Sequence, residues 1–184
     1  MPITIDGDGT ITGANINRPA FRATVTTEQS VTTLTGITTS HSKEYEEVIE
    51  YNNEEFDTNS CYDPTTYRFT PNLAGYYHVH VQTYLTVSNG SKEIVRMLLR
   101  IYKNTNTVVS TYEHDMPDDT EFSSQSIATS GIVSMNGTTD YLYAKILVRL
   151  ESNRTAVVDP VIDIALADSD TNILNIFEAY KLNI

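Results

Sequence analysis

Two histidines stand two residues apart in a segment that alternates between polar and apolar residues. His78 and His80 would point to the same side of a β-strand, and that spacing can bring two neutral imidazoles onto one metal ion. No cysteine or carboxylate lies at a matching local spacing. We therefore predict no metal site and favour a histidine pair that faces solvent or a subunit interface.

Carboxylates gather in two stretches. Five fall within the nine residues from Glu113 to Glu121, and a looser group extends from Glu44 to Asp57. Carboxylate oxygens are the ligands that hard cations prefer, so a bridged cation is one interpretation. Acidic runs are more often solvated loops, and we favour that interpretation for both stretches.

The opening of the chain alternates aspartate and glycine, as calcium-binding loops also do. Placing Gly9 at the loop glycine puts Thr4 at the first ligand position and Asn15 where a bidentate glutamate is required. We therefore predict a hairpin or edge strand around the Asp-Gly turn, with a metal-binding loop as the alternative.

The sequence contains no nucleophile in a catalytic motif. There is no Gly-x-Ser-x-Gly segment, and the single cysteine, Cys61, has no protease-like context. A lone cysteine cannot form an internal disulfide and is most often a small buried hydrophobic residue. We predict no catalytic residue, no cofactor and no enzymatic activity. A hydrolase that uses acidic pairs, or a metal on His78 and His80, is the least favoured alternative.

The elements that carry these residues are predicted to be β-strands. Period-two alternation is clearest from Gly75 to Val87 and recurs from Glu93 to Lys103 and from Tyr141 to Leu150. Asn89-Gly90 and Asn136-Gly137 are typical of tight hairpin turns. The predicted core side chains of the long strands are Tyr77, Val79, Val81, Leu85, Val87, Val95, Met97, Leu99, Ile101, Leu142, Ala144, Ile146, Val148 and Leu150.

Shorter strands are predicted between and around the long ones, and no amphipathic helix competes with them. About ten strands at this spacing indicate an all-β sandwich or barrel. The shorter candidates are Phe21 to Thr26, Glu47 to Tyr51, Thr66 to Phe69, Thr107 to Tyr112, Phe122 to Val133, Val157 to Leu166 and Ile173 to Ile184.

Tyrosine is unusually frequent, with twelve tyrosines and no tryptophan. Tyrosine combines a large apolar face with a polar tip and is enriched where proteins meet. Tyr76, Tyr84, Tyr141 and Tyr143 alternate with the core residues of their strands. These four are therefore predicted to lie at an interface between subunits.

Charge excludes two classes of partner. The 184 residues include 24 acidic and 12 basic side chains, a formal net charge of −12 that repels nucleic acid and anionic membranes.

The N-terminus has neither the basic start nor the apolar stretch of a secretory signal, so we expect folding in a cytoplasm. A chain of this length can bury a single hydrophobic core without disulfides or a structural metal.

Several segments in order resemble a C1q/TNF-type domain. The resemblance implies a ten-stranded jelly-roll sandwich that forms a tight homotrimer through apolar and aromatic residues, meets ligands at loops or subunit clefts, and does not catalyse a reaction. It divides the chain into an anchoring or docking arm, residues 1–18, and a C1q-like domain, residues 19–184. The segments are PAFRA (19–23), YDPTTYRFTPNLAGYY (62–77), RIYKN (100–104), MNG (135–137) and FEAYKL (177–182).

A second resemblance concerns the opening PITIDGDGTITG (2–13), which is similar to openings of small virion proteins of tailed bacteriophages, especially cyanophages. It implies a phage virion structural protein that decorates or cements the capsid or forms a small fibre head. Residues 1–18 would then dock onto capsid or tail proteins, and the virion would assemble in the host cytoplasm. The alternative is a receptor- or glycan-binding adhesin module, at a fibre tip or in a bacterial surface or secreted protein.

Overall fold

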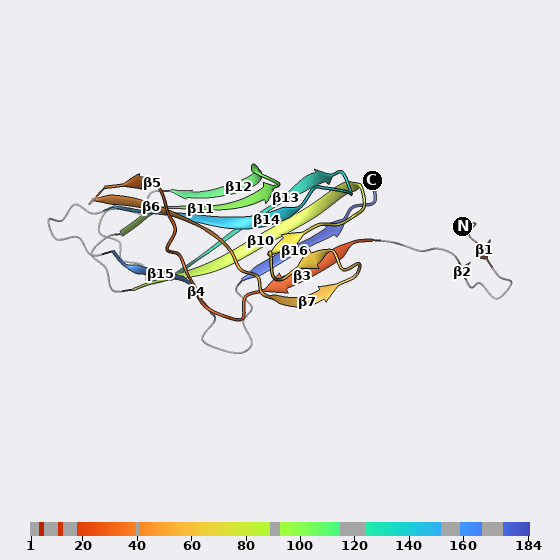
Figure 1. The fold of residues 1–184 in the computed structure, drawn as a ribbon, viewed down its shortest axis with the longest axis horizontal. Coiled ribbons are helices and arrows are strands. Elements are labelled where there is room, and N and C mark those ends of the chain that lie inside the picture. Colours follow the sequence, from red (N-terminus) through yellow and green to blue (C-terminus); the bar gives the residue numbers. More distant parts are fainter. Residues whose placement is uncertain are drawn as a thin grey trace.

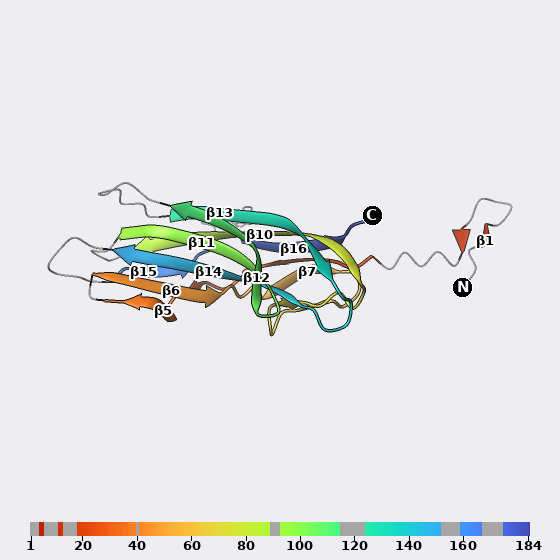
Figure 2. The same ribbon diagram turned by 90° about the horizontal axis from the view of Figure 1, so that it is seen from above.

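The computed structural model describes residues 4–5, 11–12, 18–39, 41–88, 93–114, 124–151, 159–166 and 175–184. Two seven-stranded antiparallel sheets pack face to face around one core (Figures 1 and 2). A separate two-stranded sheet pairs β1 (Thr4–Ile5) with β2 (Ile11–Thr12). In the described part of the chain, no helix has the length and apolar character needed to cross a membrane.

The first sheet, which we call the β10 sheet, is organised around its longest strand, β10 (Gly75–Ser88). β13 (Ser124–Met135) pairs with β10 over twelve residue pairs. β10 also pairs with β16 and β15, and the sheet continues outward from both of these strands. The remaining strands are β3 (Ala20–Thr24), β4 (Gln29–Ser30), β7 (Asn53–Asp57), β15 (Val161–Ile164) and β16 (Ile176–Lys181).

The second sheet, which we call the β14 sheet, has the order β12-β11-β14-β6-β5. β9 adds to β14 through the pair Leu142 and Phe69, and β8 pairs with β9. The strands are β5 (Leu34–Thr38), β6 (Ser42–Val48), β8 (Tyr62–Asp63), β9 (Arg68–Phe69), β11 (Glu93–Lys103), β12 (Asn106–His114) and β14 (Leu142–Glu151).

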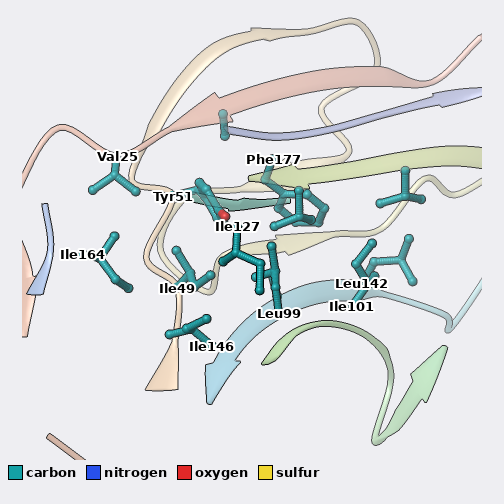
Figure 3. Packing of buried hydrophobic residues seen from close by; sticks show 14 of the residues in the cluster. Val25, Ile49, Tyr51, Leu99, Ile101, Ile127, Leu142, Ile146, Ile164 and Phe177 are labelled. Carbon is teal, nitrogen blue, oxygen red and sulfur yellow. The ribbon is translucent and has the colours of Figure 1, made fainter. Parts of the chain in front are cut away.

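The core lies between the two sheets, as the alternation predicts (Figure 3). Aromatic rings concentrate at one end, where the Phe21 ring stacks on Tyr62 at 4.5 Å and on Phe69 at 4.7 Å between centroids. The edge of Phe177 closes this cluster at 4.8 Å from Phe21. Burial of such rings supplies a large share of the hydrophobic stabilisation.

The predicted class, an all-β sandwich of the jelly-roll type, is confirmed, but the strand count is not. The two sheets hold fourteen strands among the described residues, where ten were expected. The four strands that were not predicted are short, with two to five residues each: β4, β5, β7 and β8. The short strands at residues 4–5 and 11–12 pair antiparallel, as the predicted hairpin requires, and its turn lies outside the described residues.

Local departures from the predictions have physical causes. A bulge between Ile94 and Arg96 shifts the β11 register, so Ile94 enters the core and Val95 does not. The expected strand Glu47 to Tyr51 is wrong in its bounds, because β6 ends at Val48 and residues 49–51 continue as a loop.

The acidic stretch from Glu44 to Asp57 is not a solvated loop, because it contains most of β6 and all of β7. Most of the acidic run from Glu113 to Glu121, and the predicted turn at Asn89-Gly90, lie outside the described residues. The chain does turn at Asn136-Gly137, but not in the predicted tight hairpin, because residues 136–141 connect β13 of one sheet to β14 of the other. Gly137 has a φ of +75°, and a Cβ there would lie 2.1 Å from the Ala74 nitrogen.

Candidate functional site

The outer face of the β10 sheet carries exposed apolar side chains. Alternation sends Tyr77 and Val79 into the core and their even-numbered neighbours outward. His78 lies opposite Ile132 of β13 and Tyr180 of β16, and its ring stacks on Tyr180 at 5.1 Å. Tyr76 is 50% exposed, Ile132 62% and Tyr180 47%. We call Tyr76, His78, Ile132 and Tyr180 the apolar patch.

One buried polar atom of the patch has no hydrogen-bond partner among the described residues. This atom is the Nδ1 of His78. The patch is bordered by Arg22, whose Nε lies 3.2 Å from Glu55 and 3.8 Å from Glu178. The apolar surface is therefore left without a cover by the described part of the chain.

Small side chains flank the patch along β13. Its other outward residues are serine or alanine, which leave room for a second backbone to approach. A hollow of about 350 Å³ opens between β12 and β13, with His80 and Val109 in its wall. The outward small residues are Ser126, Ala128, Ser130 and Ser134.

The outer face of the β14 sheet is charged, and its charges are paired. Glu46 of β6 accepts hydrogen bonds from Arg100 at 3.0 Å, Lys145 at 2.9 Å and the Tyr102 hydroxyl at 3.1 Å. Burial by itself raises the pKa of Glu46, but Lys145, Tyr102 and Arg100 together outweigh it and lower the pKa. The carboxylate is thus held ionised by three neighbours.

Three tyrosines stack side by side beside this carboxylate. Tyr102 and Tyr143 are 5.2 Å apart between ring centroids, and Tyr143 and Tyr141 are 6.0 Å apart. A cation covers each end of the row, because Arg68 lies 4.2 Å from the Tyr141 centroid and Lys145 lies 5.2 Å from that of Tyr102. We call these three residues the tyrosine row.

A pocket opens where the tyrosine row meets β8 and β9. Phe69 and Tyr62 point inward with Leu142, so alternation turns Arg68 and Asp63 outward beside Tyr141. The pocket has a volume of about 310 Å³. We call it the Arg68 pocket; its lining includes Ser60, Cys61, Tyr62, Asp63, Thr66, Arg68, Thr70, Asn72 and Tyr141.

Two ionisable groups in the Arg68 pocket have shifted pKa values for identifiable reasons. Hydrogen bonds from the hydroxyl and backbone N–H of Thr65 and the hydroxyl of Thr66 lower the pKa of Asp63 to about 2. Burial, reinforced by Asp57, raises the pKa of the Cys61 thiol. Cys61 is buried, as predicted, and it donates its S–H to Asp57 at 3.1 Å.

A family model described as C1q domain matches residues 20–130, more than half of the chain. The chain belongs to the C1q domain family. No curated protein matches this C1q domain in sequence.

Solved structures share the fold of this C1q domain. The crystal structure of murine APRIL at pH 5.0 has a TM-score of 0.53 and 11% identity, and the match covers 90% of this chain and 99% of that chain. Eiger TNF from S. frugiperda has a TM-score of 0.50 and 11% identity, with 90% of this chain and 92% of that chain covered. At such identities the likeness establishes the jelly-roll fold alone.

The four predicted interface tyrosines fall on two different sheets of the C1q domain. Tyr76 and Tyr84 belong to β10, whereas Tyr143 belongs to β14 and Tyr141 directly precedes it. The two sheets stack face to face (Figure 1). Because the alternation of buried residues turns all four tyrosines away from the core, the two pairs lie on opposite sides of the sandwich. Their role in a trimer stays a prediction.

His78 and His80 both lie on the outer face of the β10 sheet, on the side expected from their spacing. Among the described residues of the C1q domain, no three histidine, cysteine or acidic side chains are placed to hold one metal ion.

Three residues of these surfaces were not predicted from the sequence: Ile132, Tyr180 and Arg68. For Ile132 a signal was present, because it is a large apolar residue at an outward position between two serines, Ser130 and Ser134. For Arg68, the neighbouring sequence carried no such signal. The pairing of β9 with β14 brings Arg68 to Tyr141, which is far away in the sequence.

Proposed function

We propose that this C1q domain is a non-enzymatic module that assembles as a homotrimer through the apolar patch. Domains of the C1q/TNF class are often trimeric and are typically non-enzymatic. The observation that carries the proposal is the exposure of Tyr76, Ile132 and Tyr180 on one sheet face. Contiguous apolar surface of this kind marks interaction sites, and its burial drives association.

A three-fold ring requires two different surfaces on each subunit, because every subunit meets two neighbours through unlike patches. The apolar patch supplies one such surface. The small-residue edge of β13 and the hollow beside His80 supply another next to it. Three chains would carry a formal charge of three times −12, that is −36, which salt screens beyond roughly 8 Å.

A charge placed in the patch tests this proposal. We expect Ile132→Lys to be recovered as a folded monomer in sedimentation velocity, because a lysine would have to be desolvated in the interface. Leu34→Lys is the matched control, since Leu34 is also exposed, at 49%, but lies on β5, the edge strand of the other sheet farthest from β12. A trimer that survives Ile132→Lys, or one that Leu34→Lys disrupts equally, would contradict the proposal.

We further propose that the trimer is a structural component of a phage virion, as capsid decoration or cement or as a small fibre head. The support is the similarity of residues 2–13 to openings of phage virion proteins, together with a fold suited to trimeric surface assemblies. Mass spectrometry of purified particles from the encoding phage tests this proposal. Recovery of the chain in stoichiometric amounts is expected, and its absence from intact particles would refute the virion role.

One observation favours the alternative role of a glycan- or receptor-binding module. The Arg68 pocket is an open, polar hollow built by a single chain, and it is separate from the apolar patch. The same trimer can present such pockets to a ligand, so the two roles are compatible.

A further inference from the structure

We infer that the Arg68 pocket binds a sugar residue that carries one carboxylate, such as a uronic acid. This inference rests on the binding-module role proposed above and does not depend on trimer assembly, because the pocket residues come from one chain. Three observations carry it: the guanidinium of Arg68, the hydroxyl-rich wall around Asp63, and the fixed backbone of the pocket loop.

The guanidinium of Arg68 differs from most of the other cations. In the described residues it lies within ion-pairing distance of no carboxylate, and it rests on the ring of Tyr141 at 4.2 Å. The contact with the ring leaves the guanidinium without a carboxylate partner, and a guanidinium can bind a carboxylate through two parallel hydrogen bonds. The cations paired with carboxylates are Arg22, Lys43, Arg100, Lys103, Lys145 and Arg149.

Asp63 selects against ligands with a second negative charge. It is the cross-strand neighbour of Arg68 and lines the same pocket. The hydrogen bonds from Thr65 and Thr66 keep it ionised, so it repels a dicarboxylate more strongly than a monocarboxylate, whose single charge Arg68 can pair. Its remaining lone pairs can still accept hydrogen bonds from hydroxyl groups. A ligand with one carboxylate and several hydroxyls satisfies both Arg68 and Asp63.

The rest of the pocket has the chemistry and size that a sugar ring requires. Ser60, Thr66 and Thr70 contribute hydroxyls, and Asn72 contributes an amide. These groups can both donate and accept hydrogen bonds, as sugar hydroxyls do. A volume of about 310 Å³ lies at the lower end of the range for small-molecule sites, which suits a single monosaccharide.

The backbone of the pocket loop is held in a conformation that non-glycine residues rarely adopt. Ser60, Tyr67 and Asn72 have φ values of 49°, 59° and 53°. Such conformations persist only where surrounding contacts fix them, and they concentrate at ligand sites. Here the Thr70 N–H bonds to the Cys61 carbonyl at 2.6 Å, and the Tyr62 N–H bonds to Asp57 at 2.7 Å. The wall is therefore preorganised for binding.

A paired titration tests the inference. The full chain is titrated with D-galacturonate and, separately, with D-galactose, and binding is followed by NMR chemical-shift changes. We expect saturable binding of galacturonate and at least tenfold weaker binding of galactose, because only galacturonate engages Arg68. Equal binding of the two sugars, or no binding of galacturonate, would overturn the inference.

Substitutions then locate the site. We expect Arg68→Gln to weaken galacturonate binding at least tenfold, and Arg68→Lys to recover only part of it because lysine lacks the planar fork. Arg149→Gln makes the same charge change eight residues beyond Tyr141 along β14, roughly 27 Å away, and should bind like the parent. Circular dichroism of each variant verifies folding before titration. Equal loss in Arg68→Gln and Arg149→Gln would reduce the effect to net charge and overturn the site.

Two outcomes separate this inference from the role on which it rests. Binding of a glycan that survives Arg68→Gln would keep the binding-module role and refute this pocket. Acetate that competes as well as galacturonate would show an anion site without sugar recognition, and it would refute the ligand class.

Discussion

The two outer faces of the sandwich differ in whether their side chains find partners within one chain. On the β14 sheet, Glu46 satisfies Arg100, Lys145 and Tyr102, and the tyrosine row is covered by cations at both ends. On the β10 sheet, Ile132 and Tyr180 are about half exposed or more, with small residues beside them. A face whose polar groups pair with one another is complete in one chain. A face of exposed apolar side chains gains stability only when a second chain covers it.

This contrast separates tyrosines that look alike in the sequence. Tyr76 and Tyr180 present exposed rings on the apolar face. Tyr141 and Tyr143 are half-buried in a stack with Tyr102 and Arg68. We therefore expect the first pair to act between subunits and the second pair to act within one subunit.

The largest expected effect comes from exchanging tyrosines on one face. The double variant Tyr76→Ser with Tyr180→Ser should weaken trimer assembly by roughly 4 kcal/mol per subunit, roughly a thousandfold, at about 2 kcal/mol for each interface anchor. The matched variant Tyr141→Ser with Tyr143→Ser should leave the trimer intact. Concentration-dependent sedimentation measures both. If the second pair dissociates the trimer and the first does not, the assignment of the faces is reversed.

Removing the central carboxylate of the charged face should have the next largest effect. Glu46→Ala leaves Arg100 and Lys145 without their partner in a half-buried setting, so we expect a loss of roughly 2 kcal/mol in the free energy of unfolding. Urea denaturation measures it. Glu151→Ala removes a carboxylate from a more exposed pair with Arg149 and should cost less than about 1 kcal/mol. Equal losses would mean that the Glu46 cluster has no special role.

Acid should weaken the charged face through the same carboxylate. The pKa of Glu46 is lower in the folded chain than its ordinary value of 4.5, so the stabilisation it provides is complete above that value. It is lost as the pH falls through the folded pKa. Between pH 5 and pH 3 the parent should therefore lose more stability than Glu46→Gln, which has no proton to gain. Parallel pH profiles would contradict the cause given for the lowered pKa.

The smallest effect is expected from one hydroxyl. Tyr102→Phe keeps the ring that stacks on Tyr143 and removes only the hydrogen bond to Glu46, so we expect a loss of about 1 kcal/mol. Thermal and urea unfolding measure it. A loss as large as that of Glu46→Ala would show that the ring packing had changed as well.

The sequence predicted most of the fold because alternation in the long strands is strong. The inward residues of β14, from Leu142 to Leu150, are buried as expected. The bulge after Ile94 could not be predicted, because an extra residue in a strand leaves little trace in the alternation of its neighbours. Alternation also gave the outward direction of Tyr76 and Tyr141 but not their separate faces.

The site depended on information that is not local. Strand order places Tyr180 beside His78 and Arg68 over Tyr141, and both contacts join segments that are distant in the chain. The similarity to C1q/TNF domains predicted the architecture that creates these neighbours. It did not predict which side chains would be exposed on each face.

The most direct test of the account is the mass of the unmodified chain in solution, measured by light scattering coupled to size exclusion. A trimer assembled through the apolar patch should be a stable species of about three times the 20.6 kDa chain mass. A monomer of 20.6 kDa that persists at high protein concentration would contradict the claim that the exposed face of the β10 sheet is a subunit interface.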